Sequence, residues 1–206
     1  MLVSKPAESS SMKRFVDMLG AGVAIVVLLP LIAAVALAIK LTSPGPTIFR
    51  QRRLGRHGEP FDVYKFRSMR INAPDIRNPD GSAFSGEDDP RVTPIGRFIR
   101  KTSLDELPQL FNVVAGDMSL VGPRPDQVDQ IRFYDERERR KLLVKPGITG
   151  LAQIAGRNDI PWKLRKALDV RYVDEQSLWL DIGILLRTIP YVLLRKGIHT
   201  EVSRRT

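Results

Sequence analysis

The longest apolar stretch of the chain lies near its N-terminus. Residues 18 to 39 carry no charge, and Asp17 is the only charged residue between Phe15 and Ile39. At about 1.5 Å per residue, a helix over this run is roughly 33 Å long, close to the hydrocarbon thickness of a bilayer. A cleaved signal peptide fits less well, because its apolar region is usually only about 7 to 15 residues long. The pattern predicts a membrane segment that stays on the protein.

Basic residues flank this run on both sides, and basic flanks favour the cytoplasmic side of a membrane. A single straight span cannot place both of its ends there. Pro30 lies near the centre of the run, where it removes a backbone donor and can bend the helix back towards the side it entered. We therefore favour a re-entrant helix, although a plain spanning helix with a tolerated proline is the alternative that these residues leave open.

After a turn-rich linker at residues 42–46, the composition changes to that of a soluble, polar domain. Short apolar segments at residues 47–49 and 61–66 predict two strands, and residues 55–60 predict the turn between them. The stretch 72–91 is rich in Pro, Gly, Asn and Asp, and we expect it to be a flexible loop over a site.

Further along the chain, residues 104–114 and 127–144 are expected to be helices. The second contains a dense run of charges at 135–141, which predicts a solvent-exposed helix face. Residues 177–196 carry large apolar side chains on nearly every turn, interrupted by a few charges. A core helix and a helix lying in the membrane interface both fit this segment.

Composition narrows the possible classes of protein. The 206 residues suit one domain, and 43% hydrophobic against 27% charged residues exclude a disordered chain. The absence of cysteine and the presence of only two histidines exclude disulfides, thiolate chemistry and histidine-rich metal sites, so any metal must be bound by oxygen. The net charge of +10 favours anionic partners such as nucleic acid, acidic lipid or phosphorylated substrates.

Asp105 and Glu106 are adjacent carboxylates near the expected start of a helix. Ser103 and Glu106 have the spacing of a capping box, so a helix cap would account for them without any catalytic role. Paired carboxylate oxygens also suit Mg²⁺. Pro108 complicates the cap, because it would delay or distort the start of the helix.

Several cations occur in settings that suit a phosphate. Glycine and prolines stiffen the chain around Arg124, and glycines surround Arg157, so either guanidinium could meet a phosphate at low entropic cost. Lys65 and Arg67 alternate with Phe66 and are expected to share one face of a strand. The glycine spacings match neither a P-loop nor a dinucleotide-binding fingerprint.

Four motifs occur in a fixed order, at residues 65–69, 103–110, 116–125 and 146–158. Together they resemble those of the bacterial sugar transferase family, the monotopic phosphoglycosyl transferases that start glycoconjugate assembly. The resemblance extends from about Met12 to Lys196. The chain is similar to the minimal form, which lacks the long multi-span N-terminal region of larger relatives.

This resemblance implies an enzyme that transfers a sugar-1-phosphate from a UDP-sugar to undecaprenyl or another polyprenol phosphate, giving a polyprenol diphosphate sugar and UMP. It implies that Asp105 is the nucleophile, which forms a covalent phosphosugar intermediate, and that Asp105 and Glu106 hold Mg²⁺. Five cations would contact phosphate or nucleotide: Arg124 and Arg157 by their match to family positions, and Lys65, Arg67 and Arg100 as weaker candidates.

The resemblance also implies an α+β, helix-rich fold on the cytoplasmic face of the bacterial inner membrane. A re-entrant helix would occupy residues 1–41, bent at Pro30, and a cytoplasmic catalytic domain with a C-terminal interfacial helix would occupy residues 42–206. Because Leu29 stands where some relatives have a serine, the bend rests on the proline alone. Anionic lipid headgroups and downstream glycosyltransferases are the further partners it suggests, and nucleic acid is not among them.

Two alternatives compete with this interpretation. The first is a membrane-tethered, Mg²⁺-dependent hydrolase of nucleotide sugars or lipid phosphates, which would use the same carboxylates with water as the acceptor. The second, more remote, is a membrane-anchored nucleic-acid-binding module, suggested by a pI of about 10.2 and the cationic stretch 50–70. A requirement for polyprenol phosphate would separate the transferase from the hydrolase.

Overall fold

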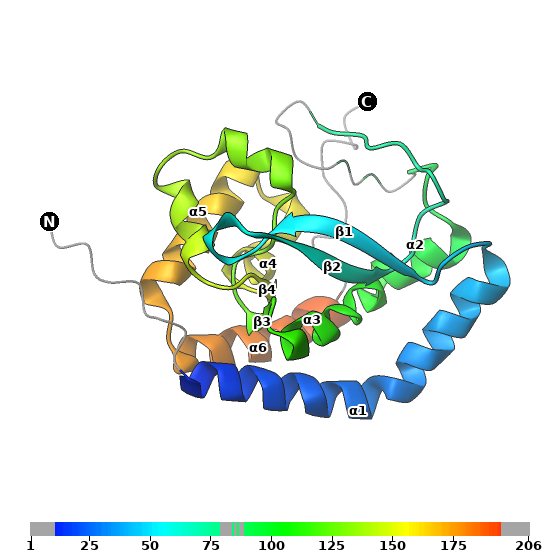
Figure 1. Cartoon of the computed structure of the whole chain (residues 1–206), viewed down its shortest axis with the longest axis horizontal. Coiled ribbons are helices and arrows are strands. Elements are labelled where there is room, and N and C mark those ends of the chain that lie inside the picture. Colours follow the sequence, from blue (N-terminus) through cyan, green and yellow to red (C-terminus); the bar gives the residue numbers. More distant parts are fainter. Residues whose placement is uncertain (1–10, 79–83, 85, 87–88, 195–206) are drawn as a thin grey trace, which may run out of the picture.

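The computed structural model describes residues 11–78, 84, 86 and 89–194 (Figure 1). The fold is helix-rich α+β, as expected. Its α-helices are α1 (Ser11–Thr42), α2 (Pro94–Lys101), α3 (Gln109–Ala115), α4 (Leu151–Ala155), α5 (Trp162–Glu175) and α6 (Leu178–Leu193). The strands are β1 (Ile48–Leu54), β2 (Pro60–Phe66), β3 (Ser119–Val121) and β4 (Gly147–Thr149). Short 3-10 helices are η1 (Arg56–Gly58), η2 (Leu104–Glu106), η3 (Val128–Phe133), η4 (Glu138–Leu143) and η5 (Arg157–Asp159).

Strands β1 and β2 form an antiparallel hairpin in which Ile48 pairs with Phe66 and Leu54 pairs with Pro60. This confirms the two strands and the turn between them, although β1 extends further than expected. The second sheet pairs β3 with β4 in parallel, so it joins segments far apart in the sequence. The short loops that follow β3 and β4 therefore leave the same edge of this sheet.

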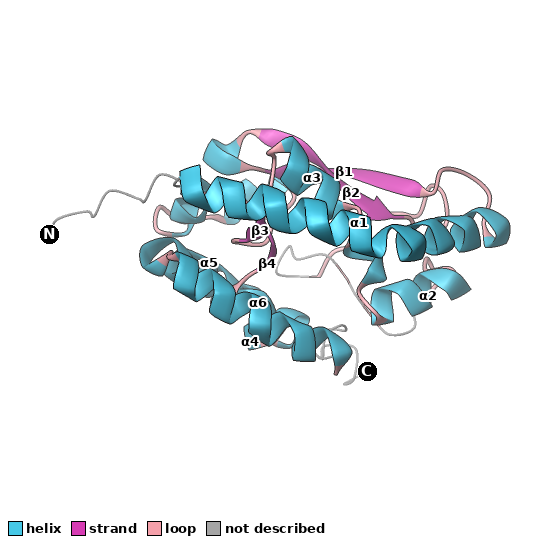
Figure 2. Cartoon of the chain, turned by 90° about the horizontal axis from the view of Figure 1, so that it is seen from below, coloured by secondary structure: helices cyan, strands magenta, loops and turns pink. Residues whose placement is uncertain are grey.

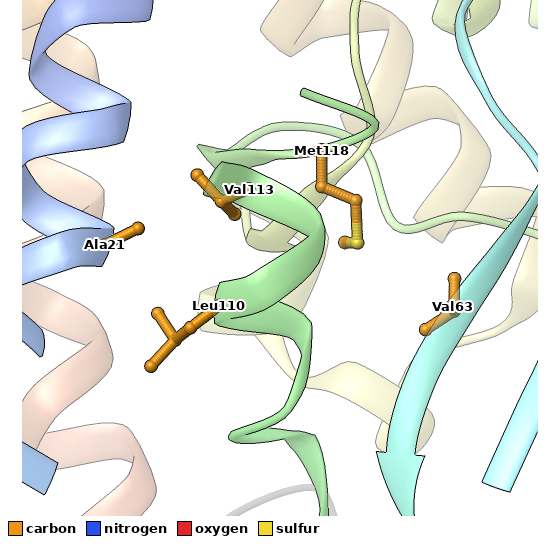
Figure 3. Packing of buried hydrophobic residues seen from close by; sticks show 5 residues of the cluster. All are labelled: Ala21, Val63, Leu110, Val113 and Met118. Atoms are coloured by element: carbon orange, nitrogen blue, oxygen red, sulfur yellow. The ribbon is translucent and has the colours of Figure 1, made fainter. Parts of the chain in front are cut away.

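Helix α3 lies between the long helix α1 and the hairpin (Figure 3). Its Leu110 and Val113 belong to a buried apolar cluster with Ala21 of α1, Val63 of β2 and Met118. This cluster anchors the N-terminal half of α1 to the rest of the fold. Since η2 immediately precedes α3, the same packing sets the position of the Asp105–Glu106 pair.

Helix α1 is continuous over 32 residues, with Pro30 inside it, and it changes direction part-way along (Figure 1). Its buried residues are Lys13, Asp17 and Ala21 in the first half and Val35 and Ile39 near the C-terminal end. The last two pack with Phe66 and Ile99 in a second apolar cluster. Both halves of α1 thus contact the same folded body. In the middle of the helix, Ala24, Ile25 and Leu28 are partly buried against the first cluster, whereas the opposite side is exposed, with Val26 at 74%.

A buried ionic cluster ties the start of α1 to β3 and α6. Lys13 Nζ donates to Asp181 Oδ2 at 2.6 Å and to the Val121 carbonyl at 3.2 Å. Asp17 accepts from the Ser119 hydroxyl at 2.8 Å, and the Tyr172 hydroxyl donates to Asp181 at 2.7 Å. These charges contact one another across more than 160 residues of sequence, so they form only when the whole fold is assembled.

Helix α6 has one face packed in the core and one face exposed. Ile184 is buried in an apolar cluster with Tyr172 and Val173, whereas Trp179 is 82% exposed and Leu186 and Ile189 are also exposed. The two views place α6 and α1 on the same face of the molecule (Figures 1 and 2). Helix α6 therefore has a buried face, as a core helix does, and an exposed apolar face, as a helix in the membrane interface does.

The prediction of a single helix at residues 127–144 is wrong. The chain forms two separate 3-10 helices there, η3 and η4, with an extended Tyr134 between them. Asp135 and Glu138 satisfy one another's backbone N–H groups, at 2.7 and 3.1 Å, and so provide an alternative to continuous helical hydrogen bonds. The prediction that the charge run at 135–141 is solvent-exposed is also wrong for Glu138 and Lys141, which are buried in ion pairs.

The helix expected at 104–114 begins later than its first residue. Pro108 is the N-cap of α3, and Leu104–Glu106 forms a 3-10 turn. Ser103 makes no capping hydrogen bond with its side chain and has a left-handed backbone, with φ of 57°. The capping-box interpretation of Ser103 and Glu106 is therefore wrong, and these two side chains are available for other contacts.

Most of the loop expected at 72–91 is described, and its described residues form no helix or strand of their own. Residues 79–83, 85 and 87–88, which belong to this prediction, lie outside the described residues, as do Arg195 and Lys196 at the end of the segment 177–196. Among the described loop residues, Asp89 and Arg91 form a buried ion pair at 2.6 Å. The role of the loop over a site stays a prediction.

Candidate active site

A cavity of about 130 Å³ opens beside η2, at the point where segments from across the chain converge. Basic and acidic side chains dominate its wall. The lining residues are Lys65, Arg100, Ser103, Asp105, Glu106, Arg124, Asp126, Lys141, Ala152, Gln153, Arg157, Trp162, Arg165, Lys166 and Asp169. The structure therefore brings together both predicted carboxylates and four of the five predicted cations.

Glu106 is held by two cations. Its Oε1 accepts from Lys65 Nζ at 3.1 Å and from Arg124 Nη2 at 2.8 Å. Burial alone would raise the pKa of this carboxyl, but the charges of Arg124 and Lys65 outweigh burial and hold its pKa far below the ordinary value. Glu106 is therefore ionised across the physiological range, and it fixes the ends of two long, flexible side chains.

Asp105 is in a different electrostatic environment. Within the described part of the chain, its carboxylate has no hydrogen bond or ion pair, although it lines the same cavity. Burial, and then the negative charge of Glu106, raise the pKa of Asp105 to about 6. Two adjacent carboxyls thus differ sharply: one is a paired structural anion, and the other is an unpaired carboxylate that is mostly ionised at neutral pH and faces the cavity.

Arg157 completes the cationic side of the cavity. Its Nη1 donates to the Ser103 hydroxyl at 3.0 Å, and its guanidinium lies 5.8 Å from the centre of the Tyr191 ring on α6. Both Ser103 and Arg157 have a left-handed backbone, with φ of 57° and 50°. Such strain is common where the surrounding structure holds a functional side chain in place.

Arg67 does not belong to this site. Strand β2 ends at Phe66, so the alternation that was expected to place Lys65 and Arg67 on one face ends before Arg67. Arg67 is buried and donates Nη2 to the carbonyl and hydroxyl of Ser43, at 2.7 and 3.1 Å, in the linker after α1. It is not among the cavity-lining residues, so the structure does not bring it together with the other four predicted cations.

Sequence reasoning missed the half of the cavity that α5 and its neighbours supply. Lys141 is buried between Asp126 and Asp169, at 2.8 and 2.7 Å, and Lys166 pairs with Glu138 at 2.6 Å. These residues belong to no recognisable motif, and in the sequence they look like the mixed charges of a solvent-exposed helix. Gln153 lies in the motif at residues 146–158, and its place in that motif was the only sequence signal for this half of the cavity.

The residues present fit a magnesium ion that a substrate helps to bind. Groups of three or more acidic or histidine ligands do not occur among the described residues, so these residues supply no complete cage. Mg²⁺ usually takes one or two carboxylates and completes its shell with water and substrate phosphates. Asp105 is unpaired, and Glu106 uses Oε1 for both of its cations, so these two carboxyls could supply the protein's share.

Comparison with known proteins places the chain in a family. The model of the bacterial sugar transferase family matches residues 8–195, so the chain belongs to that family. It is 49% identical over 90% of its length to a galactosyl transferase, CpsE, of Streptococcus agalactiae. It is 44% identical over 86% of its length to the UDP-glucose:undecaprenyl-phosphate glucose-1-phosphate transferase of Escherichia coli.

These relatives differ in how much of them the chain spans. The chain covers 43% of the streptococcal protein and 39% of the one from Escherichia coli, so it spans less than half of either. It covers 87% of the exopolysaccharide production protein ExoY of Rhizobium meliloti, to which it is 40% identical over 90% of its own length. The residues matched by the family model, 8–195, include all of the cavity-lining residues.

Proposed function

We propose that this protein transfers a sugar-1-phosphate from a UDP-sugar to undecaprenyl or another polyprenol phosphate. The observation that carries the proposal is the contrast between Asp105, unpaired and facing the cavity, and Glu106, which two cations hold. A nucleophile must be free to move onto phosphorus, whereas the groups that receive a diphosphate must be fixed. The names of the relatives support the donor and the acceptor.

The chemistry proceeds as two displacements at one phosphorus atom. An oxygen of Asp105 attacks the β-phosphorus of the donor, and the bond from that phosphorus to the bridging oxygen breaks. UMP leaves with the bonding electron pair, and the sugar phosphate stays on Asp105. A phosphate oxygen of the polyprenol phosphate then attacks the same phosphorus and releases the Asp105 carboxylate, which restores the enzyme.

The cations of the cavity offset charge during both steps. Lys65, Arg100, Arg124 and Arg157 line it together and suit the oxygens of a diphosphate. We propose that Asp105 and Glu106 hold Mg²⁺, which would neutralise phosphate charge when bound. Because Glu106 already orders Lys65 and Arg124 without substrate, less side-chain entropy is lost when the donor binds.

We propose further that the protein is monotopic and lies on the cytoplasmic face of the inner membrane. Helix α1 is long and apolar enough to enter a bilayer, with only 11% of its most apolar stretch buried against the protein. Its two ends contact the same folded body, which favours a re-entrant helix over a span. The exposed apolar side of α6, on the same face of the molecule, suits the membrane interface.

Replacing Pro30 with alanine is expected to let α1 span the membrane. Alanine restores a backbone donor and removes the clash that bends the helix, so the segment can straighten. The chain lacks cysteine, so a single cysteine introduced at position 5 can be labelled with an impermeant maleimide in sealed vesicles. A second single-cysteine protein, carrying Arg139→Cys, marks the side of the catalytic domain. In the parent, the cysteine at position 5 should be labelled from the same side of the membrane as the catalytic domain, and in Pro30→Ala it should be labelled from the opposite side. If it is still labelled from the side of the catalytic domain in Pro30→Ala, the proline does not determine the topology.

The donor half-reaction should depend on pH through Asp105. Because the pKa of this carboxyl is raised to about 6, the reactive carboxylate is lost as the pH falls through that value. We expect kcat/KM for the donor to be constant above about pH 7 and to fall roughly tenfold per pH unit below about pH 5. In Glu106→Gln the midpoint should shift to lower pH, because a neighbouring negative charge is gone, while the maximal rate falls. A profile that is flat between about pH 5 and 8 would contradict this assignment.

The function itself is tested by following UMP release from a panel of UDP-sugars by the purified protein in lipid nanodiscs. With Mg²⁺ alone, we expect one UMP per active site and a phosphosugar adduct that intact mass detects. Adding undecaprenyl phosphate should convert this burst into multiple turnovers. Continued turnover without the lipid would indicate a hydrolase instead, and the sugar that supports turnover identifies the donor.

A further inference from the structure

Gln153 lies on α4 and lines the cavity that contains Asp105 and Glu106. The residue is only 4% exposed, yet neither Nε2 nor Oε1 has a hydrogen-bond partner within the described part of the chain. Buried polar side chains in folded proteins are nearly always paired. An unpaired carboxamide on the wall of a cavity indicates a ligand that offers one acceptor and one donor side by side.

The charged residues on this side of the cavity already have partners. Lys141 donates to Asp126 and Asp169, and Lys166 donates to Glu138. Among the described residues of this wall, the Gln153 carboxamide is the neutral group of which neither polar atom has a hydrogen-bond partner, and the charged Asp169 also keeps one unpaired oxygen, Oδ1. The carboxamide does not suit the diphosphate, because its oxygen would face the phosphate oxygens and four cations line the cavity for that role.

We propose that Gln153 binds the uracil ring of the donor through the imide edge of the base. This rests on the proposed function, in which the donor is a UDP-sugar. The Nε2 amide would donate to a ring carbonyl, and Oε1 would accept from the ring N3–H. Both groups are planar and place a donor and an acceptor side by side, so the two hydrogen bonds form together in one plane.

The surroundings of Gln153 favour a base over the sugar of the donor. Ala152 and Trp162 line the same cavity and are almost fully buried, so the cavity that Gln153 lines also has apolar wall. A base has two apolar faces and carries its polar atoms on its edge. A hexose carries hydroxyls around its whole ring, and each of them would need a partner.

The test measures binding rather than turnover. UMP and N3-methyl-UMP are titrated into the 206-residue chain in lipid nanodiscs. The methyl group replaces the N3–H from which Oε1 would accept a hydrogen bond. In the parent protein, UMP should bind about tenfold more tightly than the methylated nucleotide. In Gln153→Leu, UMP should weaken about tenfold, and the difference between the two ligands should disappear.

Two controls separate recognition of the base from general damage. Gln176→Leu is the same substitution at the end of α5, where Nε2 donates to the Tyr172 hydroxyl at 3.3 Å and the residue does not line the cavity. It should leave both nucleotide affinities unchanged. Inorganic pyrophosphate, which keeps the phosphate contacts and lacks the base, should bind the parent and Gln153→Leu equally.

Three results would overturn the inference. The first is equal affinity of the parent protein for UMP and N3-methyl-UMP, which needs no variant and so no assumption about folding. The second is a difference between the ligands that persists in Gln153→Leu. The third is unchanged UMP binding in Gln153→Leu with a raised KM for the UDP-sugar, which would assign Gln153 to the sugar. Failure of the proposed function would show separately, as a parent protein that forms no phosphosugar adduct.

Discussion

Asp105→Asn is expected to abolish the transfer reaction. The asparagine amide has nearly the same size as the carboxylate, but it is not a nucleophile, and UMP release should fall by about 1,000-fold or more. The phosphosugar adduct should be absent from the intact mass. Because Asp105 has no ion pair within the described chain, the substitution breaks no ion pair or hydrogen bond there, and removal of an unpaired carboxyl from a partly buried site should not lower the thermal midpoint.

Asp62→Asn is the matched control. Asp62 lies on β2 outside the cavity, with a side chain that is 40% exposed, so this variant should retain parental rates. A nearly parental burst of UMP from Asp105→Asn would exclude Asp105 as the nucleophile. Loss of the burst together with a lower thermal midpoint would instead assign Asp105 a structural role. Only loss of activity in a protein of unchanged stability supports the proposal.

Lys13→Met is expected to cause the largest loss of stability. It leaves the carboxylate of Asp181 buried without its cation, and breaking a buried ion pair from one side typically costs about 3 to 5 kcal/mol. For a chain of this size, we expect the thermal midpoint to fall by roughly 6 to 20 °C in nanodiscs. The start of α1 should then also detach from β3 and α6, because Lys13 joins the two.

A double variant distinguishes loss of the pair from loss of the lysine stem. In Lys13→Met/Asp181→Asn the unpaired charge of Asp181 is gone, and the amide oxygen can still accept from the Tyr172 hydroxyl. Asp17, which also loses Lys13, keeps its hydrogen bonds from Ser119 and Leu120. The double variant should recover at least about half of the decrease in the thermal midpoint. Arg171→Met, which removes an exposed pair with Glu175, should change nothing measurable. If Lys13→Met behaves like Arg171→Met, the cluster does not stabilise the fold.

The local features of the fold were predictable because they depend on residues close together in sequence. The apolar run before Lys40 indicated the long helix, and the short apolar segments on either side of the turn at residues 55–60 indicated the hairpin. Pro108 indicated that a helix could not simply start at Ser103. Prediction was wrong where side chains redirected the backbone, as when Asp135 and Glu138 satisfied each other's N–H groups and divided the helix expected at 127–144.

The sequence by itself determined which residue types are present for the chemistry: adjacent carboxylates, several cations and an apolar segment with a central proline. Only the tertiary structure decided their roles, because the roles depend on contacts between distant segments. Lys65 and Arg124 come from different parts of the chain, and their meeting at Glu106 makes it a paired anion and leaves Asp105 unpaired. Burial depends on the same contacts. The segments that pack against a charged or polar side chain determine whether it is paired or can bind a ligand.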